Sequence, residues 1–155
     1  MKKRMLSIIL TVCMIMSTFA ALSVTASTIE RGECGDNLTW TFNHDDGTLT
    51  ISGTGDMWNN DYLSPWYIFC KSILSIIIED GVTSIGDSVF YNCSSLTSIT
   101  IPDSVISIGV GAFSECSSLT NITIPDSVTS ISYDSFYKCN SLSDINVNRN
   151  NPKYS

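Results

Sequence analysis

The sequence predicts a β-rich α/β solenoid, in which 23-residue coils stack on one another. Segments 96–118 and 119–141 agree at 14 of 23 positions without a gap. Segment 73–95 fits the same frame, and residues 142–155 begin a fourth copy. A fixed period of about 20 to 50 residues is typical of solenoid proteins. We therefore expect function to reside on a stacked surface rather than in a single deep pocket.

Each copy predicts a strand, a turn, a second extended segment and a short helical turn. The motif L-x-x-I-x-I-P alternates at its end, so residues such as Ile99 and Ile101 face inward on a strand. Pro102 ends that strand because proline cannot donate to a sheet. Gly109 permits a bend before the helical turn that carries Phe113 inward. Stacked coils then form a parallel sheet with strands about 4.8 Å apart and right-handed crossovers.

Residues 27–72 predict an N-terminal cap. After a loose lead-in over 27–34, two alternating runs surround a turn that ends at Gly47, which is typical of a β-hairpin. Leu38, Trp40 and Phe42 share one face of this hairpin. We expect it to cover the first coil of the repeat region, 73–155, with residues 66–72 forming a half-coil between the two.

Residues 1–26 predict a cleaved signal peptide. Lys2, Lys3 and Arg4 precede an apolar run, and small residues lead to a cleavage point after Ala26. A membrane anchor and a lipoprotein cut at Cys13 fit less well, because serines and threonines interrupt the run and the residues before Cys13 are not small. Removing this segment changes the net charge from −7 to −10. Such an acidic product disfavours nucleic acid and anionic membranes as partners.

At the other end, Leu142, Ile145 and Val147 begin a fourth strand, and polar residues follow from Asn148. The pattern shows no apolar second half and no capping element. We expect either a fragment of a longer protein or a C-terminal face open for self-association.

A ladder of cysteines recurs once per coil, at Cys70, Cys93, Cys116 and Cys139. The spacing fits no zinc site, because zinc signatures need close pairs. Stacked parallel side chains rarely satisfy disulfide geometry, so we interpret these residues as buried thiols. Cys34 is left over, and pairing with Cys70 is an alternative.

Asp80, Asp103 and Asp126 also stack in register after each strand. One hypothesis is that each carboxylate accepts hydrogen bonds from its own turn. The alternative is an acidic stripe that binds calcium through oxygen ligands.

The sequence predicts no enzyme and no cofactor. The one histidine, His44, lies in the predicted hairpin turn, and no nucleophile motif surrounds the serines. The remaining candidate is the outward face of the predicted strands, since repeat proteins bind on such extended surfaces. A solvated face without a ligand is the alternative. The candidate residues are Ser75, Ile77, Ser98, Thr100, Asn121, Thr123, Asp144 and Asn146.

The repeat motif L-x-x-I-x-I-P-x-S-V-x-x-I-G-x-x-A-F-x-x-C resembles the BspA-type leucine-rich repeat of bacterial surface proteins, over residues 73–155. Segment 32–66, with its C-G-x-N-L-T-W and D-G-T-L-T-I-S-G-T-G motifs, is similar to a module that often precedes such repeats. The resemblance implies a secreted or surface-displayed right-handed horseshoe that binds an extracellular protein or glycan, with adhesion as the commonest role. The alternatives are a structural spacer or display element of a longer surface protein, or an accessory domain of a secreted enzyme.

Overall fold

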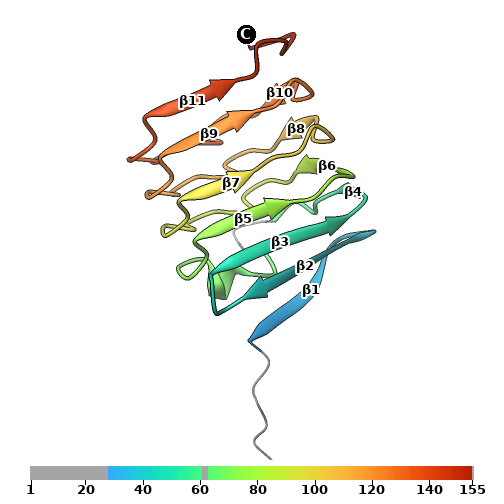
Figure 1. The fold of residues 1–155 in the computed structure, drawn as a ribbon, viewed down its shortest axis with the longest axis vertical. Helices are drawn as coiled ribbons and strands as arrows, with labels where there is room; N and C mark the ends of the chain where they lie inside the picture. Colours follow the sequence, from blue (N-terminus) through green and yellow to red (C-terminus); the bar gives the residue numbers. More distant parts are fainter. Residues whose placement is uncertain (1–27, 61–62, 155) are drawn as a thin grey trace, which may run out of the picture.

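The computed structural model describes residues 28–60 and 63–154, which wind into a β-solenoid of about four turns with little helix (Figure 1). The predicted signal peptide lies outside the described residues. The solenoid itself is confirmed, and successive coils stack along the long axis of Figure 1 from β1 toward the C-terminus.

The strands form two columns of parallel strands, with a hairpin at the N-terminal end. One five-stranded sheet has the order β1 (Ile29–Gly35), β2 (Leu38–Asn43), β3 (Thr48–Gly53), β5 (Ser75–Ile78) and β7 (Ser98–Thr100). In the same column, β9 (Asn121–Ile124) pairs with β11 (Asp144–Val147). The second column has the order β10 (Ser130–Ile131), β8 (Ser107–Ile108), β6 (Val82–Ile85) and β4 (Gly55–Asp56).

The register of the parallel pairs repeats the 23-residue period of the sequence. Ile76 lies opposite Ile99, and Ile122 lies opposite Ile145. In the second column Ser107 is aligned with Ser130. Because every coil has the same length, like residues stack on like residues throughout the repeat region.

A column of aromatic rings runs through the core. Ring centroids are 5.6 Å apart for Trp66 and Phe90, 5.4 Å for Phe90 and Phe113, and 5.6 Å for Phe113 and Phe136. The Trp66 indole also donates a 2.8 Å hydrogen bond to the carbonyl of Val89. By sequence alignment Tyr67 matches the phenylalanines, yet it is 40% exposed while Trp66 is fully buried. The Trp66 indole therefore takes the place in the ring column that the 23-residue period predicts for Tyr67.

The α/β part of the predicted fold class is wrong. In the described part of the chain the helical structure is limited to a 3-10 turn, η1 (Tyr67–Phe69). Each predicted helical turn instead contains two residues with φ between 54 and 63°, four positions apart, such as Ser88 and Asn92. Left-handed residues interrupt an α-helix. The backbone N–H groups of Ser88 and Asn92 bond instead to the carbonyls of Val110 and Ser114 in the next coil, both at 2.9 Å.

The expected loose lead-in over 27–34 is also wrong, because β1 pairs antiparallel with β2. Strands β2 and β3 form an antiparallel hairpin, and β3 then pairs parallel with β5, with Leu49 opposite Ile76. The short strand β4 pairs with β6 in the second column. The stacking of coils thus begins at Thr48, before the half-coil that the sequence indicated.

At the C-terminal end, Asn151 covers part of the third coil where the sequence shows no apolar pattern, whereas the free side of β11 has no partner among the described strands. This residue is fully buried and occupies the place that Val128 has in the preceding coil. Its Nδ2 donates to the carbonyls of Pro125 and Val128 at 2.8 and 2.9 Å. The Tyr154 hydroxyl accepts a 2.9 Å hydrogen bond from the Ile131 N–H. The fourth coil therefore continues with polar residues in place of an apolar pattern. Asn151 and Tyr154 form hydrogen bonds with backbone groups of the third coil.

We expect Phe113→Ala to lower the free energy of unfolding by about 3–5 kcal/mol, because it removes a ring stacked between two others. Urea denaturation measures this change. The control Ile106→Ala truncates a side chain that is 52% exposed and should change the free energy by less than about 0.5 kcal/mol. Equal effects of the two substitutions would contradict a core organised around the ring column.

Candidate binding surface

The predicted candidate residues lie together on one surface, which we call the strand face. It consists of the outward side chains of β5, β7, β9 and β11. The members are all exposed except Ser75, which is partly buried. They lie on one side because side chains along a strand alternate between its two faces.

The strand face extends further than the sequence indicated. Thr48 on β3 is aligned with Ser75, and Thr50 is aligned with Ile77. These threonines therefore add another row to the face. The alternation in T-L-T-I of residues 48–51 indicated a strand. The repeat did not indicate that this strand joins the face, because Leu49 and its partner Ile76 are separated by more than one repeat. That spacing places β3 outside the frame of the repeat.

The strand face offers hydrogen-bonding groups in rows about 4.8 Å apart. Asn121 donates to the hydroxyl of Thr120 at 3.1 Å, and Asp144 accepts from Ser143 at 2.9 Å. Within residues 28–60 and 63–154, the hydroxyls of Thr100 and Thr123 make no hydrogen bond to protein. Each hydroxyl can both donate and accept, so the face can adapt to several polar partners.

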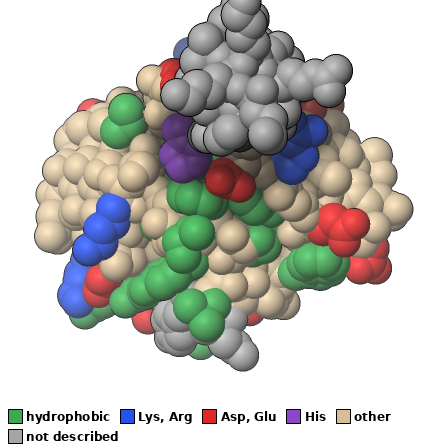
Figure 2. All heavy atoms as spheres, turned by 90° about the horizontal axis from the view of Figure 1, so that it is seen from below, with side chains coloured by type: hydrophobic (Ala, Val, Ile, Leu, Met, Phe, Trp, Pro, Cys, Tyr) green, Lys and Arg blue, Asp and Glu red, His purple; other side chains and the backbone are tan. Residues whose placement is uncertain are grey.

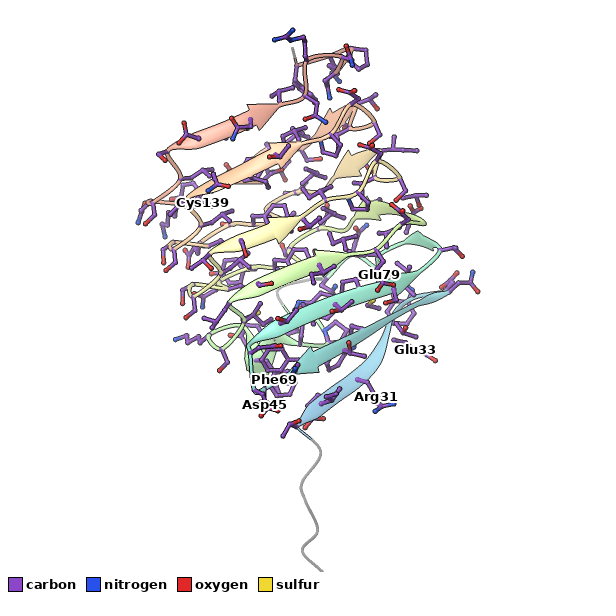
Figure 3. All side chains as sticks on the ribbon, in the orientation of Figure 1. Arg31, Glu33, Asp45, Phe69, Glu79 and Cys139 are labelled. Atoms are coloured by element: carbon purple, nitrogen blue, oxygen red, sulfur yellow. The ribbon has the colours of Figure 1, made fainter. Side chains whose placement is uncertain are left out.

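An open groove lies beside the strand face, at the ends of β5 and β7. Glu79, Asp80, Thr100 and Asp103 contribute to its lining, and Glu79 projects at the end of β5 in Figure 3. Asp80 and Asp103 are exposed, whereas Asp126 in the next coil is partly buried.

Neither hypothesis for these three aspartates gains support from the structure. The hydrogen bonds of the described residues include none to their carboxylates, and the Asp126 Oδ1 is buried without a partner. The N–H of Gly81 bonds instead to the Ser104 hydroxyl of the next coil at 3.1 Å. Among the described residues, no group of three histidine, cysteine or acidic side chains has the arrangement of a metal site.

The cysteine ladder consists of free thiols in the core, as the spacing predicted. Cys34 and Cys70 are also unpaired, so the alternative disulfide does not form in this structure. The thiols of Cys116 and Cys139 donate to the carbonyls of Phe90 and Phe113 at 3.2 and 3.1 Å. Burial raises the pKa of Cys34 to about 12 and also raises the pKa values of the Cys93, Cys116 and Cys139 thiols.

His44 lies in the hairpin turn, as predicted, with its side chain 42% exposed. Its imidazole ring contacts the rings of Phe42 and Phe69, with centroids 4.8 and 5.2 Å apart. Nε2 is 4.0 Å from the carboxylate of Glu30. These contacts place the histidine at the rim of the aromatic core. Across residues 28–60 and 63–154, no helix has the length and apolar character needed to span a membrane.

Comparisons with known proteins agree with this architecture. The model of the family described as "BspA type Leucine rich repeat region (6 copies)" matches residues 65–155. A leucine-rich repeat protein from Eubacterium ventriosum is 27% identical, with a TM-score of 0.57, and the match covers 79% of this chain and 45% of that protein. The chain therefore matches less than half the length of that relative.

A leucine-rich repeat protein from Bacteroides capillosus is 23% identical with a TM-score of 0.50, and it shows the shared fold. The match covers 74% of this chain and 96% of that protein. None of the curated proteins compared with the chain matches it.

We expect the five described cysteines to resist a thiol reagent such as dithionitrobenzoate in the folded protein at pH 8. The thiolate is the reactive form, and a raised pKa keeps the thiols of Cys34, Cys93, Cys116 and Cys139 protonated. The Cys70 thiol is protected because it is buried. Absorbance measures the reaction, which should proceed fully once guanidinium unfolds the chain. A Ser141→Cys variant is the control, because position 141 is exposed and its thiol should react at once. Rapid labelling of any described native cysteine in the folded state would contradict the buried ladder.

Proposed function

Because the chain belongs to the BspA-type leucine-rich repeat family, we propose that it recognises an extracellular protein or glycan through its strand face, in an adhesive role. One observation carries this proposal. The candidate side chains of successive coils form a continuous exposed surface, and hydroxyls such as those of Thr100 and Thr123 have no partner in the described protein. Recognition of this kind is non-covalent, and the proposal includes no catalytic step.

The shape of the strand face favours a protein partner over a small molecule. The rows from β3 to β11 form an extended surface, and the neighbouring groove at the end of β5 is open. A stable protein interface buries about 800 Å² on each partner, which several adjacent rows can supply. Ile77, which is 41% exposed, provides an apolar contact among the polar groups. Apolar contacts surrounded by hydrogen-bonding groups are typical of such interfaces.

We also propose that the protein is exported and acts in solution outside the cell or on the cell surface. The charged start, apolar run and small-residue exit of residues 1–26 support export. The charge of −7 argues against nucleic acid as the partner.

The N-terminal strands are proposed to cap the solenoid. Trp40 packs edge-on against Trp66, with centroids 6.0 Å apart, and Phe42 stacks on Phe69 at 5.1 Å. These contacts join the buried face of β2 to the start of the ring column. Seen from the β1 end, a band of hydrophobic side chains remains visible among polar ones (Figure 2). The proposed cap therefore shields the core while leaving some apolar surface at this end.

A structural spacer or an accessory domain of a secreted enzyme is the second candidate. It is favoured by the extent of the match to the Eubacterium ventriosum protein, which is more than twice as long as the matched part. Sequencing the coding DNA beyond Ser155 tests it. A reading frame that continues into more coils would favour the spacer, with further binding surface in the added coils.

Self-association through the last strand is a further proposal. Among the described strands, β11 is paired on its β9 side and has no neighbour on the other. Ile145 on β11 is 50% exposed. A strand edge with free N–H and carbonyl groups is a template for pairing with a second copy.

Replacing Thr100 and Thr123 with arginine should weaken ligand binding at least about tenfold, because long charged side chains would project from the centre of the strand face. Surface plasmon resonance against purified extracellular matrix proteins and glycans measures this effect. The control Thr129→Arg introduces one arginine at an exposed position before β10, to be compared with each single substitution and with the double one. Binding that survives the double substitution, or that falls equally with the control, would reject the strand face as the site.

Sedimentation velocity should show concentration-dependent dimers that Ile145→Lys abolishes. A lysine on an edge strand opposes edge-to-edge pairing. The control Ile106→Lys changes a residue that is equally exposed, at 52%, but lies outside the first strand column. A wild-type protein that stays monomeric at all concentrations tested would contradict this proposal.

A further inference from the structure

A second hollow lies on the turn segments that follow the second strand column, apart from the strand face. Its volume is about 310 Å³. The floor comes from the middle coil, where Gly111 and Ser114 are small and buried. Tyr91 borders it from the preceding coil, and Tyr133 and Tyr137 border it from the following coil. We call this hollow the tyrosine groove.

The groove exists because one coil carries serine at a position where both neighbouring coils carry tyrosine. Positions 91, 114 and 137 are equivalent in three successive copies of the repeat, and they read tyrosine, serine, tyrosine. Coils stack about 4.8 Å apart, so the backbones at Tyr91 and Tyr137 are about 10 Å apart. The missing side chain at Ser114 leaves room for a ring-sized ligand between the two aromatic residues.

Two of the three tyrosines of the groove contribute little to the core. Tyr133 is 74% exposed and Tyr137 is 53% exposed. Single exposed aromatic residues are common, but several around one hollow mark a binding site. Aromatic side chains combine a flat apolar face with a hydroxyl group, which suits a ligand that is itself partly apolar and partly polar.

Charged groups at the rim narrow the class of ligand. Lys138 donates a 2.8 Å hydrogen bond to Glu115, and the Tyr91 hydroxyl donates to the same carboxylate at 3.5 Å. The Lys138 ammonium also lies 5.2 Å from the centre of the Tyr137 ring. A protein cation therefore already occupies this ring, which disfavours a cationic ligand.

An anionic ligand is disfavoured as well. Asp134 lines the groove beside Tyr133, and the chain carries a net charge of −7. What remains is a neutral ligand that both donates and accepts hydrogen bonds. Carboxylates accept, the ammonium donates, and the serine and tyrosine hydroxyls do either. A sugar has matching hydroxyls around a ring whose C–H groups can pack on the aromatic faces.

We propose that the tyrosine groove binds a neutral carbohydrate. This site is separate from the strand face and does not depend on the protein-binding role proposed for it. With both surfaces in one chain, the protein would engage a glycan along its turn segments while its strand face holds another partner.

The test titrates the full chain with neutral oligosaccharides of glucose, mannose and N-acetylglucosamine, using isothermal calorimetry and saturation-transfer NMR. At least one should bind, with saturation passing from tyrosine protons to the sugar ring. Tyr133→Ala and Tyr137→Ala should each lower the affinity about tenfold or more, since a stacking surface is lost. Tyr67→Ala is the matched control, because it removes an exposed tyrosine outside the groove and should leave the affinity unchanged.

Two outcomes overturn the carbohydrate proposal. The first is absence of binding to every neutral oligosaccharide at millimolar concentration, and the second is binding that is unaffected by both groove substitutions. Binding of choline or of a sulfated glycan in place of neutral sugars would also overturn it. Unchanged thermal unfolding of the two variants shows that lost affinity reflects the groove. The Thr100→Arg and Thr123→Arg double variant should retain carbohydrate affinity, which separates this site from the strand face.

Discussion

Backbone hydrogen bonding between equivalent positions of successive coils is the constraint on which the rest of this structure depends. At the starts of strands in the two columns, N–H groups such as those of Thr97 and Ile106 donate to carbonyls of the preceding coil, those of Leu74 and Thr83. In the turn segments they donate to the following coil, as from Phe113 to Ser135. A coil alone cannot satisfy these groups, and buried unpaired backbone groups are costly. The coils are therefore stable only as a stack.

This constraint also determines how the core is filled. Equal coil lengths bring like side chains into register, so phenylalanine stacks on phenylalanine and each ladder cysteine lies above another. A thiol suits its position because it is small and because its S–H reaches a carbonyl of the neighbouring coil, as from Cys116 to Phe90. The two ends of the stack depart from the repeat. Trp66 begins the ring column, and the buried amide of Asn151 bonds to backbone carbonyls where valine stands in the other coils.

The outward positions are free to vary because the backbone and the inward residues hold the coils together. On the strand face the outward positions carry rows of hydroxyl and amide groups. On the turn segments they leave a gap between tyrosines. Both surfaces combine residues from several coils. A change in one outward residue would therefore alter the surface with little effect on the fold, and one fold can carry different surfaces in this way.

The sequence by itself determined the period, the inward positions and the residues of the strand face, because all of these follow from the repeat and from alternation along a strand. It also indicated the buried thiols. The tertiary structure alone decided three features. The predicted helical turns became turns with left-handed residues, because alternate N–H groups, such as those of Ser88, Phe90 and Asn92, bond to carbonyls of the next coil. Strand β3 joined the parallel sheet although its offset from β5 is longer than one repeat. The tyrosine groove appeared because side chains one repeat apart are neighbours only after the coils stack, and no local pattern in the sequence reports that contact.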